Sequence, residues 1–187
     1  MLTDAMNLFL IGYRCTGKTS VGQVLAQQLG WHFVDTDRMV VAAAGVSIDR
    51  MVTNHGWLFF RKQERQALVS VSAGDRQVVA TGGGMILDER NVSTMKRSGR
   101  IVWLTASETT ILTRMRGDSA TSESRPSLTR QGLTAEIATV LAERRPLYEK
   151  AADHVVATDR RTVTVICERI LAALEMRNLA ACQPPTA

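Results

Sequence analysis

The feature that most constrains this chain is residues 12–19, which read GYRCTGKT and fit the pattern GxxxxGK[ST] at every fixed position. Before it, residues 7–11 form a short apolar stretch that is typical of a buried parallel strand. After it, apolar residues recur at helical spacing over residues 21–29, and Gly30 ends the predicted helix. A strand, a glycine-bounded turn and a helix N-terminus are the structural context that this pattern requires.

The chemistry expected of this segment is phosphate binding. A tight turn before a helix N-terminus directs consecutive backbone N–H groups at an anion, and the helix dipole adds to the attraction. Lys18 can reach the outer phosphates of a nucleotide, and the Thr19 hydroxyl can ligate Mg²⁺. The alternative is a chance glycine turn before a helix. Because the strand, turn and helix signals agree, we interpret the segment as a binding site for a nucleoside triphosphate.

The size and composition of the chain are those of one globular domain. It has 187 residues, of which 45% are hydrophobic and 22% charged. No apolar run approaches the roughly 20 residues that a membrane span needs, and the first residues lack the pattern of a signal peptide. The three cysteines (Cys15, Cys167 and Cys182) are scattered without metal-type spacing. We therefore predict a cytoplasmic protein with no membrane partner.

The net charge of the chain is +5, from 23 Lys+Arg against 18 Asp+Glu. A basic balance is compatible with nucleic acid or with small anionic ligands. There is no lysine-rich tail and no basic run interleaved with aromatic residues, and aromatic residues make up only 5% of the chain. Stacking on bases therefore has little support, and we expect small anions rather than nucleic acid as ligands.

The rest of the chain alternates between predicted strands and helices. Besides residues 7–11, strands are predicted at residues 31–34, 77–81, 100–104 and 154–157, each followed by a helical pattern. The alternation predicts one three-layer α/β domain, with a five-stranded parallel sheet and helices on both faces. We expect the domain to occupy residues 1–176 and residues 177–187 to be a frayed tail.

Two groups of residues follow predicted strands. Asp35 and Asp37 come at the end of the second strand, and ligands of doubly wound sheets gather at the carboxyl ends of strands. One acid can assist a metal ion and the other can meet a substrate; the alternative is a pair of solvated acids that cap a helix. Gly82, Gly83 and Gly84 follow the third strand. Three glycines cost backbone entropy, so we expect a ligand against their amides, with a flexible loop as the alternative.

Two arginine-bearing segments complete the candidate site. Arg61 lies beside an aromatic cluster at residues 57–60 and three residues before Glu64. A guanidinium held partly out of water is suited to bidentate carboxylate recognition; a surface ion pair is the alternative. Residues 116–128 are small and polar and carry arginine, so they predict a mobile lid, with a disordered connector as the alternative.

Taken in order, these motifs resemble those of the shikimate kinase family. The resemblance covers residues 7–158 and depends on the phosphate loop, residues 33–37, Phe60-Arg61, residues 81–84, Arg125-Pro126 and residues 144–148. It implies a phosphate-loop kinase fold and ATP-dependent phosphorylation of the 3-hydroxyl of shikimate, in chorismate and aromatic amino-acid biosynthesis. It also implies Mg²⁺ as cofactor, with shikimate and ATP as ligands. We expect a monomer.

The resemblance assigns a role to each candidate residue. The implied catalytic residues are Lys18, Asp37 and Arg125; the ATP-binding residues are Gly12, Tyr13, Arg14, Cys15, Thr16, Gly17, Lys18, Thr19, Ser20 and Arg116; the substrate-binding residues are Asp37, Arg61, Gly82, Gly83, Gly84 and Arg144; the metal-binding residues are Thr19 and Asp35. Asp37 would hold the attacking hydroxyl, and Arg61 and Arg144 would bind the carboxylate. The chain departs from the family at Cys15, where glycine is common.

Other functions of the phosphate loop find less support. A GTPase-type switch would carry an N-K-x-D segment and a D-x-x-G segment, and neither occurs in this sequence. A nucleic-acid-linked ATPase would need a basic groove, of which the sequence shows no sign. The alternatives kept open are another small-molecule kinase of this fold, such as a gluconate-type kinase, and a nucleotide-binding protein without kinase activity.

Overall fold

The computed structural model describes residues 6–117 and 132–181 of the chain. In this part of the chain, the five strands form one parallel sheet in the order β2-β3-β1-β4-β5. The strands are β1 (Asn7–Ile11), β2 (His32–Asp35), β3 (Gln77–Ala80), β4 (Gly99–Thr105) and β5 (His154–Ala157). The predicted five-stranded parallel sheet is therefore confirmed.

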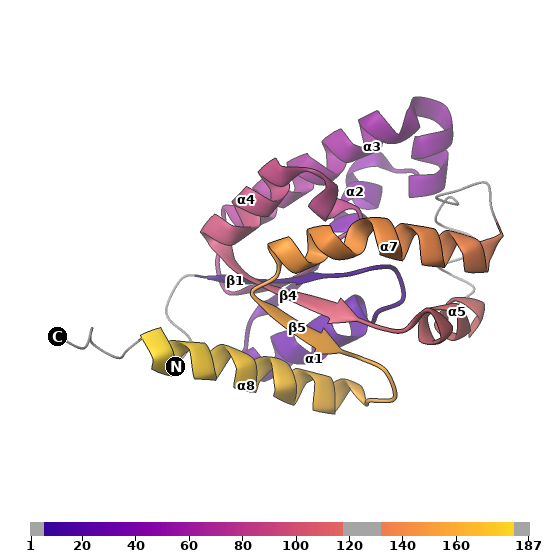
Figure 1. Cartoon of the computed structure of the whole chain (residues 1–187). Helices are drawn as coiled ribbons and strands as arrows, with labels where there is room; N and C mark the ends of the chain where they lie inside the picture. Colours follow the sequence, from indigo (N-terminus) through magenta and orange to yellow (C-terminus); the bar gives the residue numbers. More distant parts are fainter. Residues whose placement is uncertain (1–5, 118–131, 182–187) are drawn as a thin grey trace.

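Helices connect successive strands and cover both faces of the sheet (Figure 1). They are α1 (Lys18–Leu29), α2 (Thr36–Ala44), α3 (Ile48–Ser72), the short 3₁₀ helix η1 (Met85–Leu87), α4 (Glu89–Ser98), α5 (Glu108–Gly117), α7 (Leu133–Ala151) and α8 (Val163–Ala181). Within the described residues, no helix is long and apolar enough to cross a membrane.

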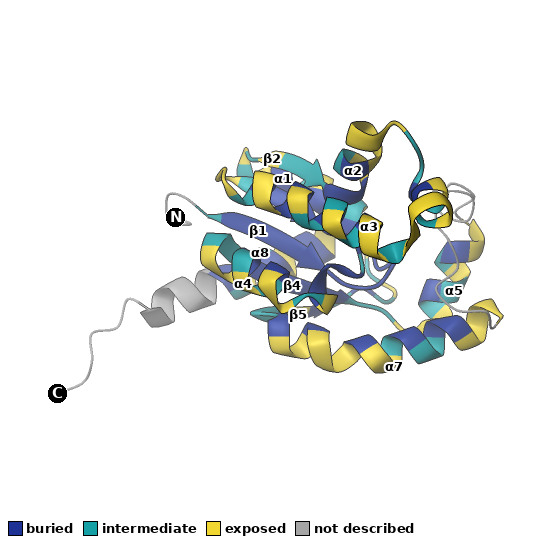
Figure 2. Ribbon diagram, turned by 90° about the horizontal axis from the view of Figure 1, so that it is seen from above, coloured by how far each residue is buried: buried dark blue, intermediate teal, exposed yellow. Residues whose placement is uncertain are grey.

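The apolar run of β1 is explained by burial on both faces. Leu8 and Leu10 pack with α1 and α8, whereas Phe9 and Ile11 pack with α3, α4 and α7. Each of these four side chains is at most 2% exposed, and each such burial contributes about 1.5–3 kcal/mol to stability. Figure 2 shows β1 as a buried strand among partly exposed helices. The first strand of the sequence therefore lies at the centre of the sheet.

Local signals in the sequence explain the ends of several helices. Gly30 ends α1 in the left-handed conformation, with φ 65°, and Ser47 caps α3 by accepting a hydrogen bond from the Arg50 amide at 3.3 Å. Asp88 caps α4 in the same way through the Arg90 amide at 2.9 Å. At Gly56 the backbone of α3 is not helical, with φ 79° and ψ 168°, so the helix is kinked there.

The structure describes part of the predicted C-terminal tail but only two residues of the predicted lid. α8 continues to Ala181, so residues 177–181 of the predicted tail are helical; their Leu and Ala residues favour continued helix. Residues 182–187 lie outside the described residues. Of the predicted lid at residues 116–128, only Arg116 and Gly117 are described, and they belong to α5.

Candidate active site

The phosphate loop joins the end of β1 to the start of α1, as predicted. Gly12 has φ 141°, and a side chain on it would collide with the Leu104 carbonyl oxygen of β4. Gly17 has φ 97° at the N-terminus of α1, a conformation that favours glycine. The Lys18 ammonium lies across the loop, where it donates to the carbonyl oxygens of Gly12 at 2.8 Å and Tyr13 at 2.7 Å. The loop therefore has the backbone geometry that the motif needs, and the Lys18 ammonium places a positive charge beside it.

Cys15 has a strained backbone conformation in this loop. Its φ of 60° lies in the left-handed region, which costs an L-residue other than glycine about 1–2 kcal/mol. Its carbonyl oxygen accepts a hydrogen bond from Arg114 Nη1 of α5 at 3.1 Å. Its half-buried side chain packs on a cluster from α5 and α7 that includes Ile111 and Ile137. Cys15 therefore adds apolar contact to the loop at a conformational cost.

Asp35 and Thr19 bring a carboxylate and a hydroxyl together beside the loop. The Thr19 hydroxyl donates to Asp35 Oδ2 at 3.0 Å. Asp35 Oδ1 accepts from the amides of Asp37 at 3.1 Å and Arg38 at 3.3 Å, so this carboxylate caps α2 and faces the loop at the same time. A hydroxyl and one carboxylate fit Mg²⁺, which also takes phosphate and water oxygens. In the described residues no group of three or more His, Cys, Asp or Glu side chains could hold a metal ion alone.

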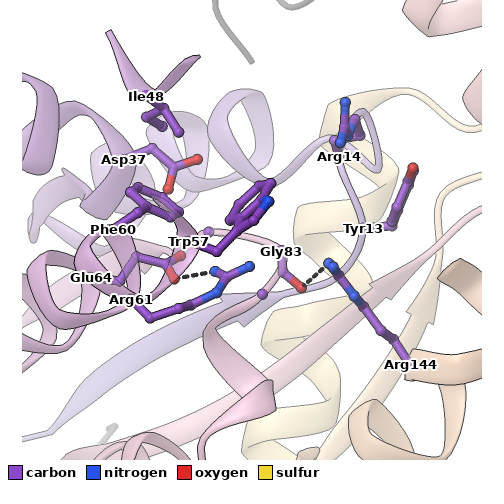
Figure 3. Close-up of a pocket in the computed structure, with 12 residues that line it drawn as sticks. Tyr13, Arg14, Asp37, Ile48, Trp57, Phe60, Arg61, Glu64, Gly83 and Arg144 are labelled. Carbon is purple, nitrogen blue, oxygen red and sulfur yellow. Dashed lines mark hydrogen bonds and ion pairs between the residues drawn. The ribbon is translucent and has the colours of Figure 1, made fainter. Parts of the chain in front are cut away.

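A pocket opens next to the phosphate loop (Figure 3). Its wall combines the loop, α2, α3, the glycine turn after β3, and α7. The lining residues are Tyr13, Arg14, Asp37, Ile48, Trp57, Phe60, Arg61, Glu64, Gly82, Gly83, Gly84 and Arg144. The pocket therefore gathers guanidinium groups, carboxylates and aromatic rings from segments that are far apart in the sequence.

Arg61 is held between a carboxylate and two aromatic rings. It forms an ion pair with Glu64, and its guanidinium carbon lies 5.2 Å from the centre of the Trp57 ring and 5.3 Å from that of Phe60. Glu64 is only 1% exposed. Burial raises the pKa of Glu64 to about 7, against the opposing effect of Arg61. The ion pair lies in the pocket wall, so the alternative of a surface pair is wrong.

The glycine turn is explained by side chains that pack against it. A side chain on Gly82 would collide with the carboxylates of Glu64 and Asp37, and one on Gly84 would collide with the Arg61 guanidinium. The Gly82 amide donates to Thr36 Oγ1 at 3.1 Å. The expected reason, a ligand against the three amides, is therefore wrong for Gly82, whose amide serves the fold.

Arg144 reaches the pocket from α7. It is 8% exposed and donates through Nη1 to the Gly83 carbonyl oxygen at 3.0 Å, as Figure 3 shows. The Tyr148 hydroxyl donates to the same oxygen at 2.6 Å, and its ring stacks on Trp103 at 5.4 Å. Burial raises the pKa of Tyr148 to about 12, so the hydroxyl stays a donor. These contacts fix the Gly83 carbonyl and orient Arg144.

The structure thus brings together most of the predicted site residues that it describes. The predicted substrate residues Asp37, Arg61, Gly82, Gly83, Gly84 and Arg144 all line one pocket. Arg14 and Tyr13, predicted for ATP alone, line this pocket as well. Arg116 is exposed, and the arginine of α5 that contacts the phosphate loop is Arg114. Arg125 lies outside the described residues.

Several residues of the site were not predicted. The sequence predicts Glu64 only as an ion-pair partner of Arg61, and it predicts no role for Glu136, Arg114 or Tyr148. The spacing from Arg61 to Glu64 was a usable signal. For Glu136 no signal exists, because an acid in the first turn of a helix usually reflects the helix dipole.

The chain matches known proteins of one family both in sequence and in fold. The shikimate kinase family model matches residues 14–175. A shikimate kinase of Syntrophus aciditrophicus (strain SB) is 42% identical over 176 residues, or 90% of each chain, and one of Oleidesulfovibrio alaskensis is 44% identical over 168 residues, or 89% of this chain and 97% of the relative. A shikimate kinase from Acinetobacter baumannii, solved in complex with shikimate, has a TM-score of 0.87 at 28% identity and covers 94% of this chain and 96% of its own. The chain belongs to the shikimate kinase family.

Proposed function

We infer that this chain transfers the γ-phosphoryl group of ATP to the 3-hydroxyl of shikimate, giving shikimate 3-phosphate and ADP in aromatic amino-acid biosynthesis. Family membership over nearly the whole chain supports the reaction, and the relative from Acinetobacter baumannii was solved with shikimate. The observation that carries the inference is the pocket beside the phosphate loop, where Asp37 lies with Arg61 and Arg144. A carboxylic acid that bears ring hydroxyls matches these groups.

Recognition of the acceptor follows from the charges of the pocket. The carboxylate of shikimate pairs with the guanidinium groups of Arg61 and Arg144, whose orientations are set by Glu64 and by the Gly83 carbonyl. Charge-assisted hydrogen bonds of this kind contribute about 1.5–3 kcal/mol each. With the carboxylate held there, the ring hydroxyls extend toward Asp37 and the phosphate loop.

Asp37 is the group suited to receive the hydroxyl proton. Its side chain is nearly buried, at 9% exposed for the residue, and lies in the pocket wall next to the glycine turn. A carboxylate at this place holds the attacking oxygen and accepts its proton as the bond to phosphorus forms. Phosphoryl transfer depends mainly on positioning and charge neutralisation, so the alignment of this oxygen with the phosphate loop is the main requirement.

The donor side is arranged around the phosphate loop. Lys18 supplies a positive charge for the outer phosphates, and Thr19 and Asp35 are the residues that would hold Mg²⁺. When bound with the nucleotide, this ion neutralises charge on the β- and γ-phosphates. The role of Arg125 at the transferring phosphoryl group remains a prediction, as do the monomeric state and the cytoplasmic location.

A substrate panel tests the proposed function. Purified protein with ATP and Mg²⁺ should release ADP in a coupled assay when shikimate is added, and much less ADP with gluconate or AMP. Chelation of Mg²⁺ should abolish the turnover, and resupply should restore it. ADP release that depends on gluconate rather than shikimate would favour the alternative kinase, and no acceptor-dependent release would favour a nucleotide-binding protein without kinase activity.

A further inference from the structure

Arg14 belongs to the phosphate loop, but its side chain lines the acceptor pocket. The residue is 9% exposed and lies in the wall with Arg61 and Arg144. In Figure 3, Arg14 and Tyr13 lie on the side of the pocket away from Phe60, Glu64 and Asp37. The Arg14 guanidinium carbon lies 5.6 Å from the centre of the Tyr13 ring. A third guanidinium therefore faces the acceptor from the donor side.

A buried carboxylate of α7 holds this guanidinium. Glu136, in the first turn of α7, is 2% exposed, and its Oε1 lies 3.5 Å from Arg14 Nη2. The Tyr13 hydroxyl donates to the same oxygen at 3.5 Å. Burial raises the pKa of Tyr13, so its hydroxyl remains a donor. A buried carboxylate is costly unless it is paired, and Arg14 and the Tyr13 hydroxyl supply partners for Glu136.

The pair resembles the other guanidinium–carboxylate pair of the pocket. Arg61 and Glu64 lie one helical turn apart on α3, and the carboxylate is buried while the guanidinium faces the pocket. Arg14 and Glu136 repeat this pattern between the phosphate loop and α7. α7 also carries Arg144, so one helix positions guanidinium groups on two parts of the wall.

We propose that Glu136 is a positioning residue for the acceptor: it holds the Arg14 guanidinium at the pocket wall, where Arg14 binds the carboxylate or hydroxyl oxygens of shikimate. The proposal rests on the proposed function. Its consequence is that Arg14 serves the acceptor although it belongs to the donor loop. Loss of Glu136 then weakens shikimate binding without a matching loss of ATP binding.

The test compares Glu136→Gln, Arg14→Met and the double variant by steady-state kinetics with both substrates. Glu136→Gln should raise the shikimate KM about 10-fold, the change expected when one charge-assisted hydrogen bond is weakened, and leave the ATP KM unchanged. Arg14→Met should raise the shikimate KM at least as much. The double variant should match Arg14→Met, because Glu136 acts through Arg14. Glu143→Gln, an exposed acid of the same helix, is the matched control and should behave as wild type.

Each result bears on the proposal. A lower melting temperature of Glu136→Gln with an unchanged shikimate KM overturns it, since Glu136 is then only structural. Additive effects in the double variant, or a rise confined to the ATP KM, overturn it as well. If Glu136→Gln does not fold, Arg14→Met against Arg14→Lys decides, and an unchanged shikimate KM in Arg14→Met overturns the proposal. Absence of shikimate turnover in the wild type would instead overturn the proposed function.

Discussion

The donor and acceptor halves of the site are built in different ways. The donor half is one continuous segment whose shape comes from backbone conformation, at Gly12 and Gly17 above all. The acceptor half is made of side chains from segments that range from the phosphate loop to α7. A backbone-built site depends on a few positions, whereas a side-chain-built site depends on many. Variants of the two halves should therefore have separable effects on the KM values for ATP and shikimate.

The two halves also differ in how their positive charges are held. Lys18 lies against neutral carbonyl oxygens of its own loop. Arg61 and Arg14 each pair with a buried carboxylate, Glu64 and Glu136. The Lys18 ammonium can leave a neutral carbonyl oxygen when a phosphate binds. An ion pair with a buried carboxylate instead holds a guanidinium in place. The acceptor half thus contains a buried carboxylate, Glu64, whose pKa is raised to about 7, which makes this half the more sensitive to pH.

The largest effect is expected at Asp37, where the two halves meet. Asp37→Asn keeps the size of the side chain and removes the carboxylate that we propose as acceptor of the hydroxyl proton, so kcat should fall by about 10²–10⁴-fold. The ATP KM should change little. The coupled ADP assay at saturating shikimate measures the loss, with Asp75→Asn in an exposed turn as the control. A near-wild-type kcat would show that Asp37 only binds the acceptor.

The next effect concerns Glu64 and pH. Its pKa is raised from 4.5 to about 7 in the folded protein, so its contribution to stability is fully present below pH 4.5 and is lost as the pH rises through about 7. Gln does not titrate. The free energy of unfolding of Glu64→Gln relative to wild type should therefore increase across this interval, by on the order of a few kcal/mol at about 1.36 kcal/mol per pKa unit.

Urea unfolding of both proteins at a series of pH values measures this difference. Glu143→Gln, at an exposed position, should show no such trend. A difference between Glu64→Gln and wild type that stays constant with pH would mean that Glu64 titrates normally, and the contrast in pH sensitivity between the halves would fail.

A smaller effect is expected at Arg61. Arg61→Ala should raise the shikimate KM by roughly 10–100-fold through the loss of charge-assisted hydrogen bonds, with the ATP KM unchanged. Arg61→Lys should recover only part of the loss, because an ammonium cannot replace the planar fork. Lys62→Ala, exposed on the same helix, is the control in the same assay. An equal rise in both KM values would contradict the division of the site.

The smallest effect belongs to the donor half. Cys15→Gly should be more stable than Cys15→Ala by about 1 kcal/mol, because only glycine adopts φ 60° without strain. This corresponds to a melting temperature about 2–4 °C higher. At Ala73 the φ of −79° is unstrained for alanine, so the variant Ala73→Gly should be less stable than the wild type. Equal stability of the two Cys15 variants would show that the loop backbone relaxes.

Local features of the acceptor half were predictable where partners lie close in sequence. The pairing of Arg61 with Glu64 follows from helical spacing, and the caps at Ser47 and Asp88 follow from residue type. The glycine turn was predicted to line the site, but for a different reason. Its need for glycine comes from carboxylates and a guanidinium of α2 and α3, and no local pattern relates β3 to those helices.

The sequence alone determined the α/β architecture, the phosphate loop and the family, because each depends on short motifs of neighbouring residues and on the order of these motifs along the chain. Only the tertiary structure placed Arg14 against Glu136 and Arg144 against Gly83, and it brought Arg114 to the phosphate loop. Such contacts depend on how helices cross the sheet, and a helix periodicity does not specify the direction of a side chain relative to a distant loop. Short-range signals thus defined the phosphate loop, and long-range packing decided which side chains complete the acceptor pocket.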